Sequence, residues 1–361
     1  MRIAVLGVGL IGGSIGLAAG RRLGAEVAGF DPDPATLARA LELGVLQTAA
    51  GSVAEACEGA EIVFCAAPVG ALPELLGVCL EASSAGTVVT DVGSTKRELV
   101  EALGADERFI GGHPLAGAET SGVDNARTEL FEGARWYLTP TASSGGVLYD
   151  RLQRAVGEIG ARPQAIDAEA HDRLMATVSH LPHVIANVLV DQAASARSDE
   201  SERLPELGPS LRDTTRIAGA NPAIWGDILW SNREAVGTAI DGAISRLEDA
   251  ARLIREGDPA TVARWQAGAA EDRRRLLAGE LAGGPLHELR AIVPNRPGIV
   301  AELALALGEA GVNIEDMALY PAQDNRTGAV SLWVAGEEQA ARASELVRQL
   351  GHTVSLVGEA D

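Results

Sequence analysis

The stretch that decides the fold is Gly7-Val8-Gly9-Leu10-Ile11-Gly12, close to the start of the chain. A short apolar run, Ile3 to Leu6, leads into it, and a helical pattern of small residues follows. A second apolar run, Val27 to Phe30, then ends at Asp31. This order predicts a strand, a glycine turn, a helix and a second strand that ends in an acid roughly 20 residues past the glycines. The context favours dinucleotide binding over glycines that mark only an ordinary turn.

Each part of this stretch has a physical task. Gly7 is expected to make the tight turn, Gly9 to let the backbone approach a pyrophosphate, and Gly12 to let helix and strand pack closely. The first helical residues, Leu10 and Ile11, lie where free N–H groups and partial positive charge face the phosphates. We therefore expect all five residues to bind the cofactor.

Asp31 selects the cofactor. Its carboxylate can accept hydrogen bonds from a ribose 2′-OH and would repel the 2′-phosphate of NADP. The following residues, Pro32-Asp33-Pro34, supply no Arg to bind that phosphate. The expected cofactor is NAD.

The composition is that of a globular protein, with 361 residues, 47% of them hydrophobic and 22% charged. A chain of this length can form two or three domains with their own cores. The formal net charge of −20 argues against nucleic acid as a partner, because phosphate binding needs a basic surface. Cys57, Cys65 and Cys79 form no metal-spaced cluster, so no metal site is expected. No signal peptide or membrane span is evident, which predicts a cytoplasmic protein without a membrane partner.

Residues 1–165 alternate strand-like and helical stretches, which predicts a Rossmann-type, doubly wound and mostly parallel sheet with helices on both faces. The expected strands include Ile3–Leu6, Val27–Phe30, Ile62–Cys65, Thr87–Thr90, Phe109–Gly111 and Arg135–Leu138. Ligands of such sheets bind beyond the carboxyl ends of the strands. Ala67 and Pro68 follow one of these ends, and we expect them beside the cofactor.

Residues 166–282 lose the strand signal, and apolar residues recur there at helical spacing. Pro182 lies inside one predicted helix and should kink it, because proline lacks the N–H that would bond the carbonyl of Val178. Asn221-Pro222 predicts an N-cap and first turn that open a long helix towards Gly257. We expect an all-helical domain that contributes to substrate binding and forms the core of a homodimer.

Gly283-Gly284-Pro285 predicts a linker. Residues 287–361 then follow the order strand, helix, strand, strand, helix, strand. This βαββαβ order predicts a small ferredoxin-like module.

Two strand ends carry residues suited to proton chemistry. His113 closes a strand within Gly111-Gly112-His113-Pro114, where an imidazole can take up or release a proton near neutral pH. Ser94, in Asp91-Val92-Gly93-Ser94-Thr95-Lys96, is placed to bond that imidazole or a substrate hydroxyl. Their structural alternatives are a histidine that bonds a loop carbonyl and a serine that caps the next helix. Lys96 is expected to be solvated or to cap that helix.

Two further pairs, each three residues apart, share a helix face. His180 and His183 flank Pro182, and contact with substrate by at least one of them is favoured over core packing or metal binding. Asp213 and Arg216 form the other pair, and a guanidinium can bind a substrate carboxylate through two parallel hydrogen bonds. Residue type alone favours a surface Asp–Arg ion pair over this ligand role.

Several segments taken together resemble the prephenate dehydrogenase family. The matching segments are Gly7 to Gly12, Asp91 to Lys96, His113 to Val123, Ser179 to His183, Asp213 to Ala218 and Pro222 to Trp225. The part around Pro294-Asn295-Arg296-Pro297-Gly298 resembles an ACT domain, a small amino-acid-sensing module. The ACT resemblance implies an effector site that includes Asn295, Pro297, Gly298 and Asn313, with tyrosine as the expected effector.

The family resemblance implies NAD-dependent oxidative decarboxylation of prephenate to 4-hydroxyphenylpyruvate, a step of tyrosine biosynthesis. In family terms, His113 removes the hydroxyl proton and Ser94 orients His113 or the hydroxyl. Arg216 holds a carboxylate, Asp213 lies beside it, and a histidine of the His180 and His183 pair contacts the substrate. Trp225 is expected to pack near the site.

Two alternatives remain open on the sequence. An arogenate dehydrogenase shares the fold and the chemistry but takes a substrate with an amino group in place of the side-chain keto oxygen. A catalytically inactive amino-acid sensor would keep the ACT module and use the dinucleotide domain as a scaffold. Asp31, Ser94, His113 and Arg216 together argue against the inactive sensor. No residue decides between prephenate and arogenate.

Overall fold

The computed structural model describes residues 1–117, 120–195, 208–278, 286–294, 296, 299–314, 316–321 and 327–357. They form two compact units, Met1–Arg246 and Leu247–Asp361. The first unit holds the predicted dinucleotide-binding sheet and most of the helices, and the second holds the ferredoxin-like module. The expected fold class is therefore confirmed, whereas the three domain boundaries stay a prediction.

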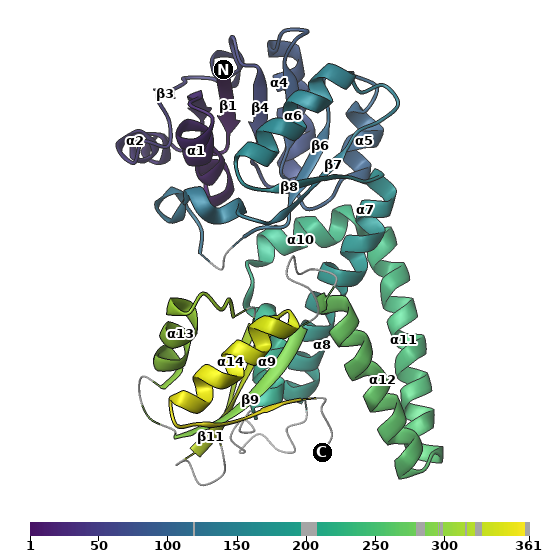
Figure 1. Ribbon diagram of the computed structural model, residues 1–361. Helices are drawn as coiled ribbons and strands as arrows, with labels where there is room; N and C mark the ends of the chain where they lie inside the picture. The colour runs from purple at the N-terminus through teal and green to yellow at the C-terminus, as the bar shows by residue number, and fades with distance from the viewer. Residues whose placement is uncertain are drawn as a thin grey trace, which may run out of the picture. The chain divides into compact units, whose positions relative to one another are not determined.

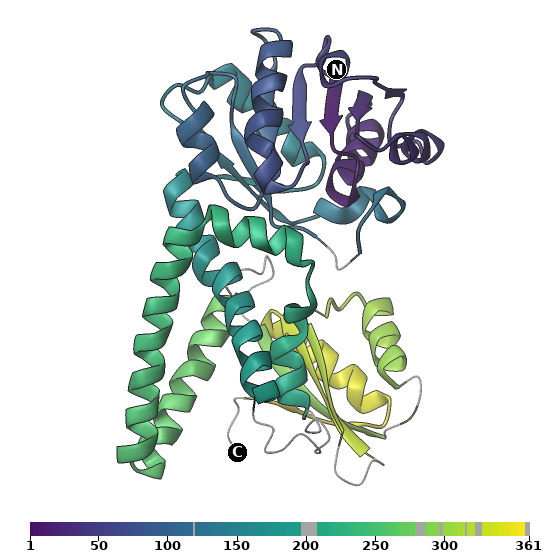
Figure 2. The same ribbon diagram turned by 180° about the vertical axis from the view of Figure 1, so that it is seen from behind.

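A five-stranded parallel sheet forms the centre of the first unit, in the order β3-β2-β1-β4-β5. Its strands are β1 (Arg2–Leu6), β2 (Glu26–Phe30), β3 (Thr48–Ala49), β4 (Ile62–Cys65) and β5 (Val88–Asp91). The helices that accompany it are α1 (Leu10–Arg22), α2 (Pro34–Glu42), α3 (Val53–Cys57), α4 (Leu72–Ala82), α5 (Arg97–Leu103) and α6 (Gly146–Glu158). Figures 1 and 2 show helices on both faces of the sheet.

The two faces of the sheet have separate cores because successive residues of a strand point to opposite sides. Ile3 and Val5 of β1 belong to the core under α1 and α6. Ala4 and Leu6 belong to the core on the other face, under α3 and α4. A central strand that is buried on both faces must be apolar there, and β4 and residues 3–6 of β1 meet that requirement.

Three later strands depart from the single, mostly parallel sheet that we expected. The strands β6 (Gly111–Pro114), β7 (Arg135–Thr139) and β8 (Arg162–Ala165) form a second sheet, in which β6 and β7 are antiparallel. One bridge, from Val89 to Phe109, links them to β5. A parallel pair needs a crossover that is usually helical. The described residues between β6 and β7 contain only short 3₁₀ turns, so β7 returns antiparallel.

A continuous helical stretch crosses the predicted Pro182 kink. It consists of α7 (Ala168–Met175), a π-helical turn (Ala176–His180) and α8 (Leu181–Ser195). The π turn ends two residues before Pro182, which lacks a backbone N–H. Local widening of the backbone at such a position is a recognised accommodation of a broken hydrogen-bond ladder.

The helix expected from Asn221-Pro222 to Gly257 is instead two helices. Asn221 caps α10 (Pro222–Ser231) and accepts the Ala223 N–H, as predicted. A turn at Asn232 then interrupts the helix, and α11 (Arg233–Glu256) begins after it. The Asn232 side chain is buried, and its amide donates to the Asp172 carbonyl. This buried bond compensates for the break. The shorter helix α9 (Pro209–Thr215) and a 3₁₀ turn (Arg216–Gly219) precede α10 and pack on α8.

The second unit contains α12 (Pro259–Ala278) and the predicted βαββαβ module. The module consists of β9 (Leu286–Pro294), α13 (Ile299–Glu309), β10 (Asp316–Pro321), β11 (Thr327–Ala335), α14 (Glu337–Gln349) and β12 (Thr353–Leu356). Its sheet runs in the order β10-β11-β9-β12 with antiparallel neighbours. Of the expected effector residues, Asn295, Pro297 and Gly298 lie outside the described residues. Asn313 is exposed, after the end of α13.

Candidate active site

The glycine turn leaves no space for larger side chains at two positions. Gly7 has φ +88°, and a β-carbon there would lie 2.4 Å from the Ala66 carbonyl oxygen. A β-carbon on Gly12 would lie 1.9 Å from the Gly7 oxygen. Gly9, the N-cap of α1, differs, because a β-carbon there would meet no described atom within 4 Å. The backbone at Gly9 is therefore open to a ligand, as a pyrophosphate at the helix N-terminus requires.

Asp31 lies directly after β2 and reaches back to the glycine turn. Its carboxylate accepts the Val8 N–H at 2.8 Å and the Asp33 N–H at 3.0 Å. Ala67 and Pro68 follow β4, which pairs with the other edge of β1. The predicted cofactor residues thus gather around the carboxyl end of β1, where open α/β sheets bind nucleotides. The arrangement suits NAD.

We predict that Asp31→Asn raises the ratio of NADP to NAD catalytic efficiency by roughly tenfold or more. The amide keeps an oxygen for the Val8 N–H but removes the charge that opposes a 2′-phosphate, and like-charge juxtaposition typically costs several kcal/mol. Steady-state kinetics with both cofactors measure the ratio. Equal efficiency with NAD and NADP in the unmutated protein would contradict the role of Asp31.

His113 is the last residue but one of β6. It lies at one end of a buried series of hydrogen bonds that continues through His171 to Asp172. Its Nδ1 lies 2.9 Å from Nε2 of His171, and His171 Nδ1 lies 2.8 Å from Oδ1 of Asp172. All three side chains are buried. His171 and Asp172 belong to α7, and neither was among the site residues predicted from the sequence. The only signal for them was an adjacent His–Asp pair, because no spacing rule joins residues 58 positions apart.

Lys96 was expected to be solvated or to cap the next helix. It is the N-cap residue of α5, although its side chain makes no capping bond, and the expectation of solvation is wrong. Its side chain is fully buried, and its ammonium forms an ion pair with Asp91. Asp91 also accepts the N–H groups of Gly93 at 2.7 Å and Gly112 at 3.0 Å. Burial lowers the pKa of Lys96, and Asp91 opposes that shift. The pair ties the end of β5 to β6 and so fixes the strand that carries His113.

The structure brings His180, His183 and Trp225 together. The ring of His183 stacks on Trp225 with centroids 3.3 Å apart, and His180 meets the same indole edge-on at 6.0 Å. His180 is buried, and its Nδ1 lies 3.1 Å from the Asn232 amide. Trp225 lies on α10, which packs on the turn Val69–Ala71 after Pro68. Trp225 therefore joins the two histidine rings, which belong to the π turn and to α8, to a helix that contacts the cofactor loop.

The remaining predicted residues lie on exposed or half-buried segments. Arg216 and Asp213 are exposed, on the 3₁₀ turn and on α9 respectively. Ser94 is half-buried in the bend between β5 and α5. Since His171 occupies Nδ1 of His113, Ser94 is left with the other ring nitrogen or the substrate hydroxyl as a partner. The roles of these three residues stay predictions.

Burial keeps the site histidines neutral. It lowers the pKa of His113 well below its usual 6.5, and the neighbouring His171 and Lys96 add to that shift. Burial also lowers the pKa of His180 to about 4. A neutral imidazole near pH 7 can accept a proton, which a catalytic base must do.

We predict that acidification from pH 7.5 to 5.5 destabilises the protein through these two histidines. Their pKa values are lower in the folded than in the unfolded state, so the unfolded chain binds more protons below pH 6.5. The stability that they contribute is complete above that pH and is lost as the pH falls. The loss by pH 5.5 is about 1.4 kcal/mol for His180, and His113 adds a loss in the same direction. Urea unfolding at both pH values measures the sum, and His180→Gln should remove the part that His180 contributes. An unchanged free energy of unfolding would contradict the neutral buried state.

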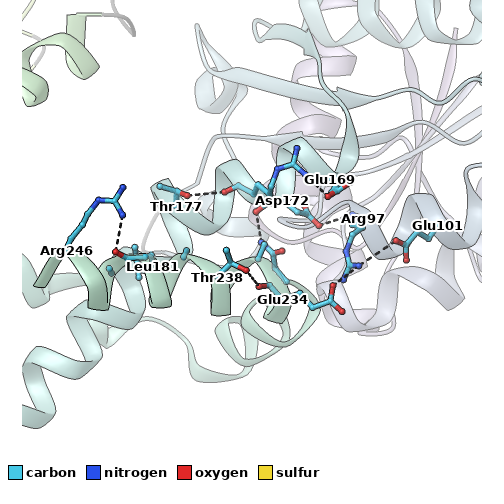
Figure 3. A pocket seen from close by; sticks show the side chains of 15 residues that line it. Arg97, Glu101, Glu169, Asp172, Thr177, Leu181, Glu234, Thr238 and Arg246 are labelled. Carbon is cyan, nitrogen blue, oxygen red and sulfur yellow. Dashed lines mark hydrogen bonds and ion pairs between the residues drawn. The ribbon is translucent and has the colours of Figure 1, made fainter. Parts of the chain in front are cut away.

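A groove of about 900 Å³ lies beside α7, and Asp172 is one of the residues that line it (Figure 3). It is bounded by α5, α7, α8 and α11, and its charged side chains include Arg97, Glu101, Glu169 and Glu234. Arg97 lies 3.0 Å from Glu234, and Arg173 lies 2.6 Å from Glu169. None of the predicted site residues lines this groove, so it is not the substrate cleft that the sequence analysis expects.

Comparison with known proteins identifies the family. The nucleotide-binding domain of prephenate dehydrogenase matches residues 17–164, its dimerization domain residues 167–267, and the ACT domain residues 287–352. A prephenate dehydrogenase structure from A. aeolicus, in complex with hydroxyphenyl propionate and NAD+, is 31% identical with a TM-score of 0.72. The match spans 76% of this chain and 98% of the A. aeolicus chain. The chain belongs to the prephenate dehydrogenase family.

Two further relatives extend this result. Prephenate dehydrogenase of Bacillus subtilis is 29% identical over 96% of this chain and 95% of its own length. Arogenate dehydrogenase of Synechocystis is 26% identical with a TM-score of 0.68, over 76% of this chain and 100% of that chain. The protein is an NAD-dependent dehydrogenase of this family with a C-terminal ACT domain. Membership alone does not choose the substrate, since both substrate classes occur among the relatives.

Proposed function

We propose that this dehydrogenase oxidises prephenate to 4-hydroxyphenylpyruvate, with loss of CO2. The observation that carries the proposal is the buried, neutral imidazole of His113 at the end of β6, held by a hydrogen bond to His171. An imidazole in this state suits removal of a proton from a hydroxyl that is being oxidised. The solved relative that holds hydroxyphenyl propionate and NAD+ supports a hydroxylated six-membered ring with a carboxylate side chain as ligand.

NAD, when bound, supplies the hydride acceptor. His113 accepts the hydroxyl proton while hydride leaves the carbon that bears the hydroxyl, and Ser94 orients that hydroxyl. Arg216 holds a substrate carboxylate through two parallel hydrogen bonds, with Asp213 beside it. His183 stacks on Trp225 and offers its ring nitrogens to the substrate. His180 is buried beside them and is held by its hydrogen bond to Asn232. As the ring becomes aromatic, the ring carboxylate leaves as CO2.

The choice between prephenate and arogenate is tested by initial rates of NADH formation with each substrate. We expect a higher kcat/KM for prephenate, because full-length relatives bear that activity in their names. A higher kcat/KM for arogenate would assign the chain to the other substrate class. Absence of NADH with both substrates, while NAD still binds, would favour an inactive amino-acid sensor.

We propose that the protein is a homodimer formed through its helical part. The matched dimerization domain supports this, and so do several large apolar side chains that the first unit leaves in solvent. They lie on neighbouring helices and are Val188 and Val190 of α8, Trp230 of α10 and Ile244 of α11. Exposed apolar patches of this kind mark interaction surfaces.

We propose a cytoplasmic location. The stretch Ala168–Ser195 is long and apolar enough to cross a membrane by length and composition alone. Its first half, however, carries the buried His171 and Asp172, which bond residues of β6 and α5. The relatives are biosynthetic enzymes, and the three cysteines are free thiols, as a reducing compartment favours.

We propose that the ACT domain binds an amino-acid effector, with tyrosine, the end product, as the first candidate. Tyrosine should inhibit the full-length enzyme, and a chain ending near Gly283 should keep activity but lose this inhibition. The A. aeolicus relative supports the truncation, because it is matched over almost its whole length and covers only 76% of this chain. Titration calorimetry measures binding directly. Full-length enzyme that neither binds tyrosine nor responds to it would leave the module a structural role, with Asn295 the first residue to examine.

A further inference from the structure

Three buried side chains form one directional chain of hydrogen bonds that ends at His113. Asp172 lies at its far end and makes two more bonds, in which its carboxylate accepts the backbone N–H groups of Lys96 at 2.8 Å and Arg97 at 2.9 Å. These bonds hold Asp172 at the start of α5. The ring of His171 is fixed from the side by Tyr137, which meets it edge-on with centroids 5.5 Å apart. The orientation of the chain is therefore set by three separate elements, β7, α5 and α7.

The carboxylate of Asp172 decides which atom donates in each of these hydrogen bonds. A carboxylate has no proton and can only accept, so the proton between Asp172 and His171 is on His171 Nδ1. A neutral imidazole carries one N–H, which leaves His171 Nε2 as an acceptor. The proton between the two rings is then on Nδ1 of His113. Nε2 of His113 is left with a lone pair, and this is the nitrogen that can accept a substrate proton.

We propose that Asp172 acts through His171 to hold the proton of neutral His113 on Nδ1, so that Nε2 is the proton acceptor of the reaction. The inference rests on the proposed function and deepens it. When the substrate O–H bond breaks, the proton goes to Nε2 and hydride leaves carbon for the bound NAD. The imidazolium that forms keeps its Nδ1–H bond to His171, whose own Nδ1–H bond to Asp172 supports the positive charge. His171 and Asp172 are positioning residues, since both act through the ring of His113.

Nitrogen NMR of enzyme labelled with ¹⁵N-histidine tests the tautomer without reference to activity. The His113 signals are identified by their loss in His113→Asn. In the unmutated enzyme at pH 7.5 we expect the proton on Nδ1 of both His113 and His171. A proton on Nε2 of His113 would overturn the proposal. This result stands whichever substrate the enzyme takes, so failure of the tautomer and failure of the proposed function are distinguishable.

Kinetics of two variants test the consequence for catalysis. His171→Phe keeps an aromatic ring against Tyr137 but removes the acceptor, so part of His113 should carry its proton on Nε2. We expect kcat to fall at least tenfold, and by no more than the about 10²–10⁴-fold that general-base help contributes, with KM changed less than threefold. Leu152→Ala is the control for lost stability, because Leu152 is buried on α6 and takes no part in the hydrogen-bond chain. It should lower Tm and keep both kcat and the His113 tautomer.

Two results with His171→Phe would contradict the proposal. If His171→Phe keeps the unmutated kcat, or keeps the His113 proton on Nδ1 while Tm falls, His171 is only a packing residue and the proposal fails. Should His171→Phe not fold, Asp172→Asn replaces it, since the loss of the carboxylate removes the group that sets the polarity of the chain. A proton on Nε2 of His113 in the unmutated enzyme overturns the proposal whatever the variants do.

Discussion

Replacement of His113 by Asn should lower kcat for prephenate oxidation by about 10²–10⁴-fold, the usual contribution of a general base. Positive charge develops at the carbon being oxidised, and loss of the hydroxyl proton relieves it. Asn cannot take that proton. NAD affinity should be nearly unchanged, because the cofactor residues gather around β1 rather than β6. Steady-state kinetics and an independent NAD titration measure the two effects.

The pH dependence of kcat/KM also tests the role of His113. Because burial lowers the pKa of His113 well below 6.5, kcat/KM should stay level from pH 8 to about 6.5 and fall only in more acidic solution. Near-unmutated turnover in His113→Asn would move the base elsewhere. His183 would then be the next candidate, since Nδ1 of His180 is already bonded to Asn232.

Replacement of Arg216 by Ala should raise KM for prephenate tenfold or more and leave NAD binding unchanged. Loss of one partner from a buried, charge-assisted pair typically costs about 2–5 kcal/mol, and the substrate would bury this guanidinium. Arg212→Ala is the matched control, because it removes an exposed positive charge one turn earlier on α9. Arg216→Lys should fall between the two, since lysine keeps the charge but not the two parallel bonds. A normal KM in Arg216→Ala would leave Arg216 as a surface residue.

Local sequence signals predicted the elements that depend on local rules. The glycine turn, the strands beside it and the βαββαβ module follow from periodicity, turn residues and strand ends. The cap at Asn221 was also predictable, because N-caps and N-terminal prolines act within one helical turn. A strand leading to His113 was expected for the same reason, but at Phe109–Gly111, whereas β6 spans Gly111–Pro114.

The parts that the sequence did not predict depend on contacts between distant segments. His171 and Asp172 become part of the site only because α7 packs against β6 and α5. Burial of Lys96 requires the Asp91 carboxylate, which two backbone N–H groups also hold. The break at Asn232 is stabilised by a carbonyl 60 residues away. The antiparallel pairing of β6 with β7 likewise depends on the path of the loop between them.

Product analysis with prephenate and NAD tests whether this protein catalyses oxidative decarboxylation. We expect NADH, CO2 and 4-hydroxyphenylpyruvate in equal amounts, with all three falling together in His113→Asn. NADH formed without CO2 would contradict oxidative decarboxylation, and CO2 released without NADH would contradict hydride transfer to NAD.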